Sequence, residues 1–369
     1  MFDFTWSDHT IGNVLYCAVI YLLFVLLFYK KYVKYALYQE HKSNQWLMLT
    51  ALILIITACI DGDWFHYREM VHNYDFIAGA YNHGEPVYAF IISFVKKNYL
   101  LFRIFVWGGA FVLTFFTFKR FEINVNTAVF FIIVLFLVKF NYSRATLGMS
   151  SYFLGLSFLL KPIKRKKMLS FIVAAFLMLL AYDFHHSMIT LVVLTIVAYL
   201  PMDKPFVVII MLLLLPIVSS VLHNNLFLID QWENEYLSDK FSHYIERETG
   251  PSNMLGIIGG IIGYGVFVIP LFLNTIVVFK NNRLIETPMK RLFRIVLSTS
   301  VLAFAFALMK LDSTIFIYRI LYMTYIPLTI LTVYFYEKGF VKLKQYSLIV
   351  FWGVFAISFK LLHLIYQYH

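Results

Sequence analysis

The sequence predicts an all-α, polytopic membrane protein with about 12 transmembrane helices. The chain of 369 residues is 61% hydrophobic and only 14% charged, whereas soluble domains average about 25% charged residues. Apolar runs recur from end to end, and many approach the roughly 20 residues that a helix needs to cross the hydrocarbon of a bilayer. No stretch has the composition of a separate soluble domain, so we expect a single integral membrane domain over residues 1–369.

Twelve apolar runs are the expected spans, and several are short and include polar residues at their ends. The segment EPVYAFIISFVKK, residues 85–97, is too short to cross, and we expect a re-entrant or interfacial helix there, within an outer loop at 61–98. A second outer loop at 223–253 is amphipathic and rich in aromatic residues; it is expected either to form a lid over the site or to connect two spans as a surface helix. The expected spans cover about residues 11–29, 46–60, 99–118, 125–141, 144–160, 168–182, 187–201, 206–222, 254–279, 295–309, 319–336 and 346–362.

The basic residues determine the expected orientation. When the spans alternate across the membrane, 20 of the 31 Lys and Arg residues fall on one side, accompanied by only five acids. By the positive-inside rule this side is cytoplasmic, and both termini are then expected outside. The net charge of +11 is spread over many short loops, whereas a nucleic-acid site would gather it on one face. The basic loops lie at 30–42, 119–120, 161–167, 204, 280–294 and 338–344.

The other side carries most of the acids and every histidine except His41, so we expect the chemistry there. The N-terminal sequence MFDFTWSDHT is acidic and aromatic, and no removable signal peptide is expected. Cys17 and Cys59 both lie in apolar runs, which favours neither a disulfide framework nor a metal cluster.

The first outer cluster is the segment DGDWFHYREMVHNYDFIAGAYNHGEPVY, residues 61–88. Its carboxylates are suited to act as a general base or to bind sugar hydroxyls, and its aromatic rings offer faces for stacking on a sugar. The alternative is a solvated loop with an aromatic belt at the interface. We favour a function for Asp61 and Asp63 because they lie at the mouth of a span. The other candidates are Glu85 as a base and Trp64 and Tyr67 as sugar-binding rings.

The second cluster, KFNYSRATLGMSSY at residues 139–152, places Lys139 and Arg144 between two apolar runs with almost no loop. A guanidinium at this depth is costly unless it faces a wet cavity or an anion. Its planar fork matches the oxygens of phosphate or carboxylate. We favour anion binding by Arg144; the alternative is an arginine that extends to the membrane interface.

The third cluster is the tight turn YDFHHSMI, residues 182–189. A neutral imidazole can accept a proton near pH 7. Because adjacent histidines on a helix start point in different directions, at most one of His185 and His186 is expected to face a site, and His186 is our candidate base. Zinc is disfavoured because the sequence has neither an HExxH motif nor a supporting cysteine.

The fourth cluster is MKLDSTIFIYRILYMTYIP, residues 309–327. Lys310 and Asp312 end one span and can pair with each other. Arg319 begins the next span without an obvious local partner, which makes it a second candidate for binding an anion. Tyr322 follows at helical spacing and is a further candidate for stacking on a sugar.

Taken in order, these elements resemble a known family. An acidic and aromatic loop follows the second span. Then come EPVY, the segment SRATLGMSSYFLGLSFLLK, a His-Ser pair in HHSMI, and finally YRILYMTY. Their order, spacing and common side resemble the EpsG-like family of Wzy-type polysaccharide polymerases over about residues 55–330. The chain departs from the family pattern where Ala145 follows Arg144, because Arg-Gln is usual there, and where Trp64 follows Asp63, because Asp-Tyr is common.

The resemblance implies a glycosyltransferase-C-like membrane enzyme in the bacterial cytoplasmic membrane, with its active site facing outside. Such enzymes join oligosaccharide repeat units carried on undecaprenyl pyrophosphate into O-antigen, capsule or exopolysaccharide. The growing chain moves from its lipid carrier to the non-reducing end of the incoming unit, and undecaprenyl pyrophosphate leaves. No metal, cofactor or nucleotide sugar is expected; the expected partners are membrane lipids, a flippase and a chain-length regulator.

The candidate residues fit this chemistry. Fixed cations stabilise the charge of a leaving pyrophosphate, so we assign Arg144 and Arg319 to it, with Lys310 as a third. The base is Asp61 or Asp63, with His186 and Glu85 as alternatives. The prediction requires Arg144 and Arg319 to share one pocket with the carboxylates.

Three other functions stay open. A flippase for the same lipid-linked sugar needs cations too, but the sequence shows no duplicated halves of the kind that many transporters have. A polysaccharide ligase has almost the same chemistry as a polymerase. A membrane acyltransferase would use His186 but would leave both arginines without a role.

Overall fold

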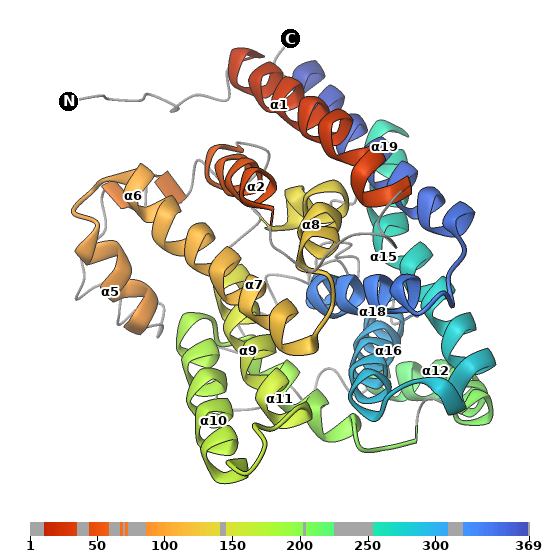
Figure 1. Cartoon of the computed structure of the whole chain (residues 1–369). Helices are drawn as coiled ribbons and strands as arrows, with labels where there is room; N and C mark the ends of the chain where they lie inside the picture. The colour runs from red at the N-terminus through yellow and green to blue at the C-terminus, as the bar shows by residue number, and fades with distance from the viewer. Residues whose placement is uncertain are drawn as a thin grey trace. The chain divides into compact units, whose positions relative to one another are not determined.

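The computed structural model of the chain describes residues 11–34, 44–58, 67–68, 71–72, 86–140, 145–201, 204–224, 254–308 and 320–367. All secondary structure in these ranges is helical, which confirms the predicted all-α class (Figure 1). The chain divides into two compact units, Met1–Val193 with Thr329–His369, and Leu194–Leu328. Each unit is described by itself.

The first unit contains most of the helices, and α11 and α18 cross its boundary with the second unit. Its helices are α1 (Ile11–Tyr29), η1 (Lys30–Lys34), α2 (Gln45–Thr57), α5 (Pro86–Phe94), α6 (Tyr99–Arg103), η3 (Ile104–Gly108), α7 (Gly109–Phe121), α8 (Val125–Phe140), α9 (Ala145–Leu160), α10 (Lys167–Phe184), α11 (Met188–Val197), α18 (Tyr325–Glu337) and α19 (Leu343–Gln367). The second unit contains α12 (Pro205–Asn224), α15 (Met254–Asn281), η4 (Asn282–Leu284) and α16 (Thr287–Leu308).

A helix lies at each of the twelve predicted spans. Among the described residues, five helices are long and apolar enough to cross a bilayer, which makes the chain a membrane protein. Shorter apolar helices include α2, α9 and parts of α8 and α12. The number of crossings stays a prediction, as does the glycosyltransferase-C-like arrangement. The five long segments are Val14–Val33, Tyr99–Phe121, Lys167–Phe184, Ile261–Leu284 and Leu343–Leu364.

Small residues let α9 pack closely on α10, and α9 also lies against α7 (Figure 1). A methyl group added at Gly148 would lie 3.1 Å from the carbonyl oxygen of Ala181, and one added at Gly155 would lie 3.0 Å from that of Ala174. Between them, the Ser151 hydroxyl donates to a carbonyl of α10 (2.8 Å). Small residues and hydroxyl bonds are what hold helices together in lipid, where the hydrophobic effect between helices is missing.

The α8 helix forms a second buried centre of the first unit, against α2 and α19. Every side chain described along it, from Val125 to Leu137, is buried. A helix that is apolar all round belongs in the interior. Tyr21 of α1 donates to the carbonyl of Val134 (3.1 Å), and Gly353 of α19 packs against Leu135.

The helix η1 and the C-terminal ends of α7 and α18 lie at one end of the first unit. Tyr336 and Tyr346 stack with ring centroids 3.9 Å apart, and the Tyr336 hydroxyl donates to the carbonyl of Val33 (3.0 Å). The backbone N–H of Asn124 donates to the carboxylate of Glu337 (2.8 Å). Much of the basic excess lies in and just after these elements in the sequence, so we call this the basic end. That the basic loops face the cytoplasm stays a prediction.

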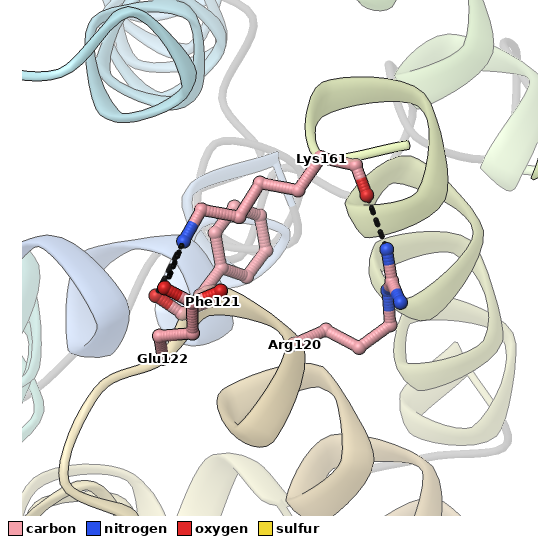
Figure 2. Close-up of polar contacts among 4 residues, drawn as sticks. All are labelled: Arg120, Phe121, Glu122 and Lys161. Atoms are coloured by element: carbon pink, nitrogen blue, oxygen red, sulfur yellow. Dashed lines mark hydrogen bonds and ion pairs between the residues drawn. The ribbon is translucent and has the colours of Figure 1, made fainter. Parts of the chain in front are cut away.

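Figure 2 shows how the last turns of α7 and α9 are joined at the basic end. Arg120 donates to the Ser157 hydroxyl (3.0 Å) and to the Lys161 carbonyl, and its guanidinium lies 3.8 Å from the centre of the Phe158 ring. The Lys161 ammonium in turn pairs with Glu122 (3.2 Å). One arginine thus satisfies a carbonyl at the end of α9.

Candidate functional site

Three of the ten predicted site residues lie in the part of the chain that the structure describes: Tyr67, His186 and Tyr322. The prediction that the arginines and carboxylates share a pocket therefore stays a prediction. The other seven, which lie outside the described residues, are Asp61, Asp63, Trp64, Glu85, Arg144, Lys310 and Arg319.

A buried arginine lies at the end of α2, whose last residue, Thr57, comes four residues before Asp61. Arg103 of α6 is only 4% exposed. Its Nε donates to the carbonyl of Ile56 (2.5 Å), and its Nη2 donates to those of Ala58 (2.7 Å) and Ile55 (3.3 Å). The last carbonyls of a helix have no partner within the helix, and a cation there also meets the negative end of the helix dipole. Arg103 therefore caps α2.

An aromatic contact connects the same arginine to the chain beyond Asp63. The guanidinium of Arg103 lies 4.8 Å from the ring centre of Trp107, one helical turn further along. The Trp107 ring in turn meets the buried ring of Tyr67 edge to face, with centroids 6.2 Å apart. Tyr67 is thus packed on α6–η3, and its stacking on a sugar stays a prediction.

The helix that follows Glu85 packs on the same element. Pro86 opens α5, at the helical position where proline is favoured because its missing N–H would be unpaired anyway. Two residues later, Tyr88 meets Phe102 edge to face at 5.8 Å, and Phe102 meets Trp107 at 5.7 Å. Tyr88 of the EPVY element therefore contacts an aromatic cluster on α6 and η3.

The start of α9 lies at the same end of the first unit. A methyl group added at Gly109, the first residue of α7, would lie 3.6 Å from Leu147 in the first turn of α9. One added at Gly148 would lie 3.0 Å from Met188, which begins α11. The residue before α9 in sequence is Arg144. Ala58, Gly109, Ala145 and Phe184 define this end of the first unit. We call it the acidic end because acidic residues come shortly before or after some of these positions in the sequence.

The histidine pair forms the turn between α10 and α11 at the acidic end. His185 follows the last residue of α10 in an extended conformation, and its N–H closes the helix on the Ala181 carbonyl. The His186 ring stacks on Tyr182, with centroids 4.5 Å apart and an interplanar angle of 17°. The prediction that only one of the two imidazoles faces a site stays a prediction. Within the described ranges, no group of three or more His, Cys, Asp or Glu side chains is placed to hold a metal ion.

In the second unit, Tyr322 is 3% exposed and stacks on Tyr325, with centroids 5.3 Å apart. Arg319 lies outside the described residues and immediately precedes Ile320 in the sequence. Tyr322 therefore packs within its own helical segment, and its contact with a sugar stays a prediction.

Arg103 is the residue whose contacts were not predicted from the sequence. An arginine inside an apolar span needs a partner, and this signal was present in the sequence YLLFRIFVW. Its partners, however, are backbone carbonyls more than 40 residues upstream, and carbonyls leave no mark in a sequence.

Comparison with known proteins supports the resemblance. A family model described as the EpsG family matches residues 44–369, most of the chain. No curated protein and no solved structure matches the chain. The matched region includes α5 and the turn between α10 and α11. Because the family model covers most of the chain, the chain belongs to the EpsG family.

Proposed function

We propose that this protein is a polysaccharide polymerase that joins lipid-pyrophosphate-linked oligosaccharide repeat units on the outer face of the bacterial cytoplasmic membrane. Family membership supports a role in polysaccharide biosynthesis at a membrane. The finer statement, a metal-independent glycosyl transfer from undecaprenyl pyrophosphate, rests on the residues of the acidic end.

The observation that carries the proposal is the convergence at that end. Ala58 and Tyr67, the nearest described residues before and after Asp61 and Asp63 in the sequence, contact Arg103 and Trp107 respectively. Helix α5, which follows Glu85, packs on Phe102. The first turn of α9, which follows Arg144, contacts the residue that ends the histidine turn. A base and a cation could therefore be supplied from neighbouring elements of one unit.

In the proposed reaction, the acceptor hydroxyl attacks the anomeric carbon of the donor chain. A new C–O glycosidic bond forms while the bond from that carbon to the pyrophosphate oxygen breaks, and the pyrophosphate leaves with the bonding electron pair. Asp61 or Asp63 takes the hydroxyl proton, which requires a base within hydrogen-bond reach. Arg144, Arg319 and Lys310 are the cations assigned to stabilise the departing charge.

The test uses cells that lack the protein and are complemented with variants. Arg144→Ala and Arg319→Ala are expected to leave single repeat units on the carrier, because loss of one fixed charge-stabilising group typically costs about 10²–10³-fold in rate. Lys164→Ala, which removes an exposed cation from the basic end, is the matched control and should restore long chains. Polysaccharide length is read on gels, and the amount of protein in the membrane by immunoblot.

Long chains in cells without the protein would refute the proposal. Long chains with both arginine variants would remove the arginines from the mechanism. Movement of lipid-linked units across sealed vesicles without any lengthening would instead favour a flippase.

A further inference from the structure

We propose that the α9–α10 loop, residues 161–167, and the exposed face of α10 together bind a phospholipid with an anionic headgroup. The phosphate of the headgroup meets the three cations that come directly before Met168, and one acyl chain lies along α10. These cations are Arg165, Lys166 and Lys167. The loop belongs to the basic end of the first unit, so the inference does not depend on the proposed reaction.

The three cations are exposed and have no partner within the described part of the chain. Their side chains make no hydrogen bond, ion pair or ring contact there. Other cations of the same end are paired within the protein, since Lys161 pairs with Glu122 and Arg120 donates to Ser157. Adjacent like charges repel one another, so an anion bound among the three stabilises them.

The backbone of the α9–α10 loop is held in one shape by its own hydrogen bonds. Residues 163–166 form a turn in which the N–H of Lys166 donates to the carbonyl of Ile163 (3.0 Å). The buried hydroxyl of Ser170 accepts the N–H of Ile163 (2.8 Å) and donates to the carbonyl of Lys166 (3.1 Å). Arg165 has a φ of 63°, where glycine is favoured, so the turn keeps a cation at a conformational cost. A loop that is already ordered loses little conformational entropy when it binds a ligand.

An exposed apolar stripe runs along α10 directly after the cations. Helix α10 is the least buried of the five long segments found in the described part of the chain. Four side chains at helical spacing lie on one face and are 53–73% exposed: Met168, Ile172, Phe176 and Leu179. At 1.5 Å per residue the stripe is about 16 Å long, which is roughly half the hydrocarbon thickness of a bilayer. The stripe therefore matches one acyl chain of one leaflet.

A phospholipid is the ligand that uses both parts of this surface. Its phosphate is attached to acyl chains, so one molecule covers the cations and the stripe. Clusters of Lys and Arg next to a membrane helix typically bind anionic lipid headgroups. Phosphatidylglycerol has a net negative charge, whereas phosphatidylcholine carries a cation beside its phosphate that opposes binding to the loop. A soluble phosphate or an acidic protein would meet only the cations and leave the stripe without a role.

The experiment measures binding to the purified full-length protein in detergent by native mass spectrometry. The probes are phosphatidylglycerol, phosphatidylcholine and glycerol phosphate, which has the phosphate without acyl chains. Phe176→Ser tests the stripe. The loop variant combines Arg165→Gln, Lys166→Gln and Lys167→Gln. The control variant removes the same charge from exposed lysines of three separate segments and combines Lys30→Gln, Lys280→Gln and Lys344→Gln.

The wild type should bind phosphatidylglycerol more tightly than phosphatidylcholine by roughly tenfold or more, because each Lys or Arg near an anionic headgroup contributes to binding. The loop variant should lose roughly tenfold or more of its affinity for phosphatidylglycerol for the same reason, and the control variant no more than about twofold. Phe176→Ser should weaken binding by roughly threefold, because apolar contact with the acyl chain is lost.

Equal affinity of the wild type for the two lipids would overturn the site, and so would an equal loss in the loop and control variants. Binding of glycerol phosphate as tight as that of phosphatidylglycerol, or full affinity in Phe176→Ser, would overturn the role of the acyl chain. If the loop variant does not fold, Lys167→Gln alone replaces it and should weaken binding by roughly threefold. Chain lengthening is not measured, so a failure of the proposed function would leave this result unchanged.

Discussion

Glu122 adopts an unfavourable backbone conformation and forms only one weak ion pair. It follows α7 with φ at 58°, in the left-handed region where glycine is favoured. Its carboxylate pairs with Lys161, but the Glu122 side chain is 79% exposed, and exposed ion pairs contribute only about 0–1 kcal/mol. The residue therefore combines strain with a weak interaction.

We expect Glu122→Gly to be more stable than Glu122→Gln by about 1 kcal/mol, because both lose the ion pair and only glycine relieves the left-handed strain. Thermal unfolding of the two variants in one detergent measures the difference. Equal midpoints would show that the left-handed conformation costs little at this position.

Among the helices, the contact of α19 with α8 leaves no room for a side chain at Gly353. A methyl group there would lie 2.7 Å from the Val134 carbonyl oxygen and 3.2 Å from the Leu135 Cα, so the backbones would have to separate. We expect Gly353→Ala to reduce the free energy of unfolding by about 1–3 kcal/mol, the usual cost of overpacking.

Gly109→Ala is the control for this prediction. Its methyl group would meet Leu147 at an ordinary 3.6 Å, and alanine favours a helix over glycine by about 1 kcal/mol. Denaturant unfolding of both variants should thus show a loss for Gly353→Ala and a small gain for Gly109→Ala. A loss of similar size in both would point to a general intolerance of change in the bundle.

The helices could be predicted because a long apolar run in lipid must pair its own backbone groups, and an α-helix does so without help from distant parts of the chain. That is why α1 and α10 have nearly the bounds expected for residues 11–29 and 168–182. The π-helical turn was not predictable, because IFVWG has the same apolar character as its flanks. The cap on α2 was not predictable either, because it depends on packing between distant elements.

At the scale of the whole molecule, the polar contacts divide the first unit into a basic end and an acidic end. Arg120, Glu122 and Lys161 mark the first, whereas Arg103, Tyr67 and His186 mark the second. The charges of the loops predict that the spans alternate in direction, and this stays a prediction. Which acidic-end side chains touch one another could not, since the four clusters are separated by whole helices.

The predicted orientation can be tested by cysteine labelling. In a chain carrying Cys17→Ala and Cys59→Ser, we expect His72→Cys to react with a membrane-impermeant maleimide in intact cells. Lys164→Cys should react only after the membrane is permeabilised, because the basic loops face the cytoplasm. Both positions are exposed, so a difference reports sidedness. The reverse pattern would place the acidic end in the cytoplasm.

The turn η3 also has a consequence for the length of the chain. A π-helical turn contains one residue more than the α-helical turn it replaces. Deleting a single residue between Ile104 and Gly108 would restore an α-helical turn and allow an unbroken α-helix from Tyr99 to Phe121. Because the shorter turn closes with one residue fewer, Arg103 would keep nearly its present direction toward α2. A deletion within the regular helix α7 would instead rotate everything before it by about 100° around the axis. The chain therefore tolerates a change of length in this turn better than elsewhere in the same helix.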